Sequence, residues 1–79
     1  MKLEILTPEN VVYSGENVVL VQLPGIDGSF EIMNDHAPII SILKKGQVKV
    51  VTKDGEKQLF SINGGVIEVL NNNIQVLAE

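Results

Sequence analysis

Short runs in which hydrophobic and polar residues alternate constrain the fold of this 79-residue chain more than any other feature. Residues 2–5 read Lys-Leu-Glu-Ile, and the same period of two recurs at residues 47–50 and 73–76. Successive side chains of a β-strand point to opposite faces of its sheet, so this period predicts strands with one buried face. No segment gives a convincing helical period, and the chain is therefore predicted to be all-β.

Turn-forming residues separate these runs at short intervals. Asp54-Gly55 predicts a hairpin between two alternating runs. Residues 63–65 (Asn-Gly-Gly) predict a second tight hairpin, residues 24–28 a longer loop, and residues 71–73 (three asparagines) a backbone with positive φ. Eight to ten short strands result, and many short strands at this spacing predict one domain with a sandwich or barrel architecture.

Composition excludes several classes of function. The net charge of −4 argues against nucleic acid and against an anionic membrane surface, both of which attract basic proteins. No apolar run approaches the roughly 20 residues that a membrane helix needs, and the alternating start does not read as a signal peptide. Cysteine is absent, which excludes disulfides and thiolate metal sites. We therefore expect neither nucleic-acid binding nor direct insertion into lipid.

His36 is the only histidine and the first candidate for chemistry. A catalytic or metal-binding histidine needs partners, and the chain has no second histidine and no cysteine to complete a zinc site. The following Ala37-Pro38 favours extended backbone and sets the direction of the next strand. We interpret His36 as a residue that fixes a corner through a local hydrogen bond, or that lies in an interface.

Carboxylates and lysines give two further candidates. Asp27, Glu31 and Asp35 could act as acid and base or bind calcium, but without EF-hand spacing they are better interpreted as solvated loop charge. Lys44-Lys45 could mark a lipoyl or biotinyl carrier domain, which presents a modified lysine at a hairpin tip. The Asp-Lys-Ala and Met-Lys-Met triplets of those domains are absent. An interaction module without cofactor or metal is favoured over an enzyme, and the carrier domain remains the alternative.

Seven motifs in order along the chain match one known family. They are residues 3–9 (Leu-Glu-Ile-Leu-Thr-Pro-Glu), 13–16 (Tyr-Ser-Gly-Glu), 23–30 (Leu-Pro-Gly, then Gly-Ser-Phe), 36–40 (His-Ala-Pro-Ile-Ile), 43–46 (Leu-Lys-Lys-Gly), 62–69 (Ile-Asn-Gly-Gly-Val-Ile-Glu-Val) and 76–79 (Val-Leu-Ala-Glu). Over residues 1–79 the chain resembles the N-terminal β-sandwich domain of the epsilon subunit of F-type ATP synthase. The resemblance implies a flattened sandwich of about ten strands.

The resemblance also implies a function. Epsilon subunits belong to the central stalk, bind the gamma subunit and the ring of proton-carrying membrane subunits, and help couple proton flow to ATP synthesis without catalysing a reaction themselves. It implies a location on the cytoplasmic face of the bacterial inner membrane. For gamma we expect contacts from Met33, His36, Ala37, Pro38, Ile39 and Ile40. For the membrane ring we expect contacts from Ile26, Asp27, Ser29 and Glu31.

The chain departs from the family pattern in two places. Asn34-Asp35 replaces the usual Pro-Gly or Pro-Asn before the histidine, and Ser29 replaces an acidic residue thought to face the ring. Asn and Asp tolerate turn geometry, and Glu31 lies two residues from Ser29 on the same strand face. The sequence ends at Glu79, where most relatives continue into a two-helix hairpin that brakes ATP hydrolysis, so that property is not carried over. A naturally short subunit and a shortened chain both fit this ending.

Overall fold

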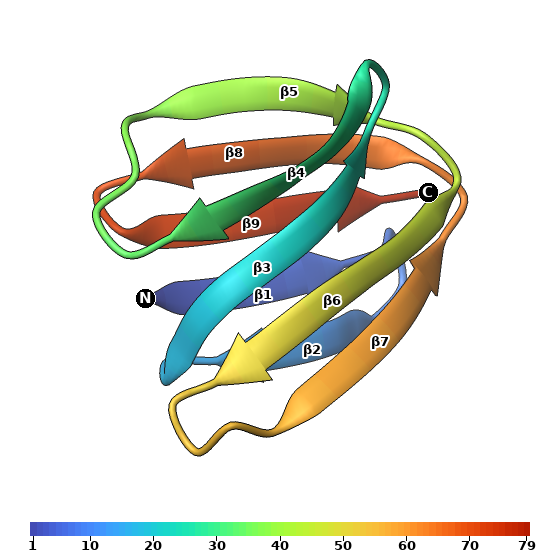
Figure 1. Ribbon diagram of the computed structural model, residues 1–79. Helices are drawn as coiled ribbons and strands as arrows, with labels where there is room; N and C mark the ends of the chain where they lie inside the picture. The colour runs from blue at the N-terminus through green and yellow to red at the C-terminus, as the bar shows by residue number, and fades with distance from the viewer.

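The computed structural model describes residues 1–79 and contains strands and turns but no helix (Figure 1). The nine strands are β1 (Lys2–Leu6), β2 (Val11–Gly15), β3 (Val18–Gly25), β4 (Gly28–Met33), β5 (Ile39–Leu43), β6 (Gly46–Thr52), β7 (Lys57–Ile62), β8 (Gly65–Leu70) and β9 (Asn73–Ala78). The prediction of a small all-β domain is confirmed. No helix of the chain is long and apolar enough to cross a membrane.

The strands form two layers that face each other. The five-strand layer has the order β2-β1-β9-β8-β5, and the four-strand layer has the order β4-β3-β6-β7. Strand pairing joins the layers where Gly25 of β3 meets Leu43 of β5, and backbone hydrogen bonds between Met1, just before β1, and Val18 of β3 join them at a second point. Figure 1 shows the four-strand layer crossing diagonally in front of the other. The architecture is therefore a β-sandwich curled into a half-open barrel.

One hydrophobic core fills the space between the layers. It is a single cluster of fifteen buried residues with no buried polar side chain: Leu3, Ile5, Val18, Val21, Leu23, Ile32, Leu43, Val48, Val50, Ile62, Ile67, Val69, Ile74, Val76 and Ala78. The period of two in the sequence explains this core, because alternate residues of each strand point inward. Burying a Val, Leu or Ile side chain contributes about 1.5–3 kcal/mol.

Tyr13 and Phe60 pack against each other where β2 and β7 approach, on the lower side of the sandwich in Figure 1. Tyr13 lies on β2 and Phe60 on β7, and their ring centroids are 5.3 Å apart with a tilt of 56° between the planes. These two strands are the edges of different layers and share no backbone pairing. The aromatic pair therefore provides the side-chain contact across this seam, in a tilted geometry that aromatic rings favour.

The turn predictions had mixed outcomes. Asp54-Gly55 connects β6 and β7 as an antiparallel hairpin, as predicted. The longer loop predicted at residues 24–28 is wrong, since Pro24 and Gly25 continue β3 and the chain reverses over Ile26-Asp27 alone. Gly28 takes a φ of 130°, which glycine adopts without steric cost, and this lets the strands pair up to the turn.

The hairpin predicted at residues 63–65 is also wrong. β7 pairs with β6 in the four-strand layer, whereas β8 pairs with β5 and β9 in the five-strand layer. Asn63-Gly64 therefore carries the chain from one layer to the other. Turn residues predict that the chain changes direction, but they do not predict which sheet the next strand joins. The positive φ predicted among the asparagines is confirmed at Asn71 (52°) and Asn72 (63°).

Candidate interaction surfaces

His36 lies in the exposed linker between β4 and β5. Its Nδ1 is 2.7 Å from the carbonyl oxygen of Ala37, in agreement with the local hydrogen bond expected from the sequence. Because a carbonyl only accepts, Nδ1 carries the proton in this arrangement and Nε2 is left facing solvent. The ring is thus used to shape the corner before Pro38.

The same corner is braced by a residue far along the chain. The backbone N–H of Asp35 donates to Oδ1 of Asn72 at 2.9 Å, and Nδ2 of Asn72 donates to Oδ1 of Asn34 at 3.4 Å. Asn72 belongs to the turn between β8 and β9. The sequence identifies Asn34 and Asn72 only as turn formers, and Asp35 also as a loop carboxylate, so it does not predict this contact; the asparagine run at 71–73 is the one available signal.

The six residues expected to contact gamma do not share one face. Met33 is exposed beside β3 in the four-strand layer, and Ile40 is exposed on the outer face of the five-strand layer. Ile39 is half-buried and packs against the core. His36, Ala37 and Pro38 are exposed in the linker between these positions. The set therefore follows the seam between the two layers.

The four residues expected to contact the membrane ring form one strip. Ile26 and Asp27 occupy the tip of the β3–β4 hairpin, and both are exposed. Ser29 and Glu31 follow on β4 and are exposed on the same face of that strand. Asp35 lies beyond the opposite end of β4, and no three His, Asp or Glu residues converge in a way that could hold a metal ion.

An exposed apolar row crosses the outer face of the five-strand layer. The strand registers align Ile42 of β5, Val66 of β8, Leu77 of β9, Leu6 of β1 and Val11 of β2. Ile42, Val66, Leu77 and Val11 are 58%, 37%, 50% and 64% exposed, and Leu6 is half-buried. We call these five residues the apolar row. Sequence reasoning missed it because the register that aligns them is not visible in the sequence.

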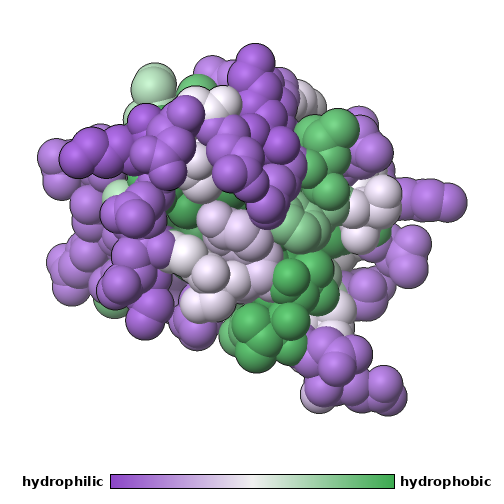
Figure 2. All heavy atoms as spheres, turned by 90° about the horizontal axis from the view of Figure 1, so that it is seen from below, coloured by the Kyte–Doolittle hydropathy of each residue, from purple (hydrophilic) through white to green (hydrophobic).

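The apolar surface extends toward the lower side of the molecule. Figure 2 views the molecule from that side and shows a strip of hydrophobic side chains between hydrophilic areas. The strands on this side are β2 and β7, whose exposed apolar residues are Val11, Val12 and Leu59. Val12 adjoins the end of the apolar row at Val11.

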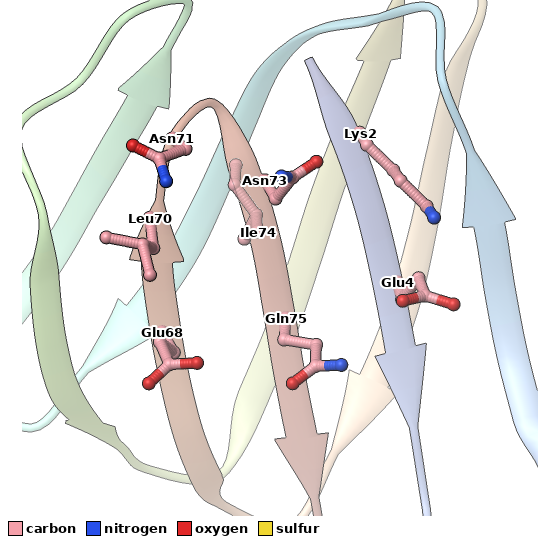
Figure 3. Close-up of a pocket in the computed structure, with 8 residues that line it drawn as sticks. All are labelled: Lys2, Glu4, Glu68, Leu70, Asn71, Asn73, Ile74 and Gln75. Atoms are coloured by element: carbon pink, nitrogen blue, oxygen red, sulfur yellow. The ribbon is translucent and has the colours of Figure 1, made fainter.

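A mainly polar row runs beside the apolar row on the same outer face. It aligns Ile40, Glu68, Gln75, Glu4 and Ser14 across the same five strands. Two hollows lie over this region and share Glu68 and Leu70. One, of about 280 Å³, is lined by polar side chains over β8, β9 and β1 (Figure 3). The other, of about 360 Å³, is mostly apolar and includes Pro38 and Ile40.

Lys44 and Lys45 do not have the setting of a carrier-domain lysine. They lie in the exposed link between β5 and β6, and these strands belong to different layers. The pair is therefore not at the tip of a hairpin. The backbone N–H of Lys44 donates to the carbonyl of Pro24 at 2.9 Å, next to the point where the layers join.

Comparison with known proteins identifies the family. The model of the ATP synthase Delta/Epsilon chain beta-sandwich domain matches residues 1–79. The ATP synthase epsilon chain of Chlorobium limicola is 44% identical over 78 residues, covering 99% of this chain and 88% of that relative. Those of Protochlamydia amoebophila and Pelagibacter ubique are 40% and 41% identical over 98% and 96% of this chain. The chain spans only 52% and 58% of these two relatives.

Solved structures agree on the fold. A chain in the central stalk and c-ring structure of Tetrahymena thermophila mitochondrial ATP synthase superposes with a TM-score of 0.84 at 16% identity, covering 98% of this chain and 61% of that one. A chain of the Euglena gracilis mitochondrial ATP synthase superposes with a TM-score of 0.90 at 18% identity, covering 96% and 48%. Sequence, family model and fold agree, and the chain belongs to the ATP synthase epsilon-chain family through its beta-sandwich domain.

Proposed function

We propose that this chain is a rotor subunit of a proton-translocating F-type ATP synthase that binds gamma and the membrane ring. Membership of the epsilon-chain family supports this function, as does the likeness to chains in solved central-stalk and c-ring assemblies. In this proposal the chain catalyses nothing, lies at the cytoplasmic face of the bacterial inner membrane, and passes torque between its partners.

The apolar row is the observation that carries the proposal. It presents five apolar side chains from five adjacent strands on the outside of the molecule. Extended apolar patches on soluble proteins mark interaction sites, because their exposure to water is unfavourable. The row lies on paired strands, so little conformational entropy is lost when a partner covers it. We assign this face to gamma.

Ile40 connects the apolar row to the corner residues expected to bind gamma. It is 73% exposed, and it lies two residues before Ile42 on the same face of β5. A partner that covers the row and Ile40 would therefore reach Pro38 and His36 in the linker just before β5. In this arrangement Met33, which is exposed on the other layer, would lie at the rim of the contact.

The membrane ring is assigned to the strip at the β3–β4 hairpin. Ile26, Asp27, Ser29 and Glu31 lie on the four-strand layer, whereas the apolar row lies on the five-strand layer. Two partners could thus bind at the same time without competing for one face. This arrangement suits a subunit that transmits torque between them.

Binding to the gamma subunit of the same complex tests the proposal. Leu77→Asp would place a charge in the middle of the apolar row, and we expect it to abolish co-purification with gamma. Ile26→Asp is the matched control for gamma, because Ile26 is similarly exposed, at 58%, but lies at the tip of the β3–β4 hairpin in the other layer. Failure of the unmodified chain to bind folded gamma, or equal loss in both variants, would contradict the assignment.

A further inference from the structure

Glu68 separates two hollows of different chemistry on the outer face of the five-strand layer. On the β5 side the hollow is mostly apolar, with Pro38, Ile40 and Leu70 in its lining. On the β9 side the hollow offers the side-chain amides of Asn73 and Gln75 and the carboxylate of Glu4. A single partner side chain that crosses from one hollow to the other would meet apolar surface first and a carboxylate next.

The charge of Glu68 is not matched by a cation within the chain. None of the side-chain hydrogen bonds involves Glu68 or Glu4. Figure 3 shows the only cation of the hollow, Lys2, extending over β1 on the side of Glu4. Glu68 lies on the other side, over β8, and Gln75 lies between them on β9, with its side chain extending toward the β1 side. Glu68 lies two strands from Glu4 in the register, so the backbones of the two residues are separated by about 10 Å.

We propose that Glu68 receives an arginine side chain of the gamma subunit. The proposal rests on the assignment of this face to gamma. It specifies the charged contact that would fix the position of gamma on the face. Arginine fits because its three-carbon stem packs on apolar surface while its head stays polar. The planar guanidinium donates two parallel hydrogen bonds to one carboxylate. A neighbouring donor can reach the amide oxygen of Gln75.

Because Glu68 adjoins the apolar row, an ion pair between Glu68 and an arginine of gamma would be shielded from water. Ile40 and Leu70 flank Glu68 on β5 and β8, and the row begins with Ile42 and Val66 on the same two strands. A partner that covers the row would exclude water around Glu68. A carboxylate buried in this way without a cation opposes binding strongly, so the partner is selected for a positive charge at this point.

The affinity of the chain for gamma, measured at two salt concentrations, tests the inference. We expect Glu68→Gln to weaken binding at low salt by about tenfold or more and to reduce the salt dependence of the affinity. Glu4→Gln is the matched control in the same row and should change binding by less than about threefold, since Lys2 lies beside it. Both residues are on the surface of the sheet, so circular dichroism should show an unchanged fold.

Exchanging the charges of Glu68 and of its partner then identifies the arginine of gamma that binds it. Glu68→Arg should abolish binding, and a panel of gamma variants with each surface arginine singly changed to glutamate should contain one that restores it. Binding unaffected by Glu68→Gln, equal effects at Glu4 and Glu68, or no rescue from the arginine panel would overturn the inference while the assignment of gamma to this face stands. Absence of binding by the unmodified chain would overturn both.

Discussion

The backbone N–H of Asp35 donates a 2.9 Å hydrogen bond to Oδ1 of Asn72, although the two residues are 37 positions apart in the sequence. Both adopt positive φ, 62° at Asp35 and 63° at Asn72. The bond ties the linker that carries His36 to the turn between β8 and β9. It explains how Asn34-Asp35 can hold this corner without a proline or glycine.

Removing this brace should loosen the corner. Asn72→Ala loses the acceptor for Asp35 and replaces asparagine, which tolerates positive φ, with alanine, which tolerates it less well, so we expect a loss of about 1–3 kcal/mol in the free energy of unfolding. Asn71→Ala is the control, because Asn71 also has positive φ but makes no side-chain hydrogen bond. The Asp35 amide should exchange with solvent faster in Asn72→Ala only. Equal exchange in both variants would contradict the brace.

Gly65 should not tolerate a side chain. A Cβ at this position would overlap the carbonyl oxygen of Leu77, and the φ of Gly65 is 148°. We expect Gly65→Ala to lower the free energy of unfolding by more than about 3 kcal/mol, measured by urea denaturation. At Gly28, where φ is 130° but no atom lies within 4 Å, Ala should cost only about 1 kcal/mol. Similar losses at both positions would show that the contact with Leu77 is unimportant.

Substitutions at Ile67 and Ile40 should distinguish a residue needed for folding from one needed for binding. Ile67 is fully buried, and Ile67→Ala should lower the free energy of unfolding by about 2–5 kcal/mol. Ile40 is 73% exposed, so Ile40→Ala should change stability by less than about 0.5 kcal/mol but weaken binding to gamma. Thermal denaturation and a gamma-binding assay on both variants check this contrast. A stability loss at Ile40 equal to that at Ile67 would mean that Ile40 belongs to the core.

The strip at the β3–β4 hairpin should respond to charge. Glu31 is exposed on the same face of β4 as Ser29. If it faces the membrane ring, Glu31→Lys should weaken binding to the isolated ring, with a larger effect at low salt than at high salt. Glu9→Lys makes the same charge change at the exposed β1–β2 turn and should leave ring binding unchanged. Equal effects of Glu31→Lys and Glu9→Lys would mean that ring binding responds to the net charge of the chain and not to this strip.

The sequence predicts those features of this fold that depend on residues close together along the chain. Alternation at Leu3 and Ile5 gives the correct buried face, and Asp54-Gly55 gives the correct hairpin. The assignment of strands to layers depends on distant pairing, and for that reason Asn63-Gly64 was mistaken for a hairpin turn. The same holds for the candidate site. The apolar row requires the register of five strands, whereas the local contact between His36 and Ala37 could be anticipated.

The parallel pairing of β1 with β9 has a consequence for how the chain folds during its synthesis. β9 lies in the middle of the five-strand layer, and β1 and β2 are attached to β8 and β5 only through it. Until residues 73–78 have been synthesised, the β1–β2 hairpin and the paired strands β5 and β8 have no strand between them. The five-strand layer, and with it the alignment of the apolar row, is therefore completed only in the last step of synthesis, when β9 pairs with both β1 and β8.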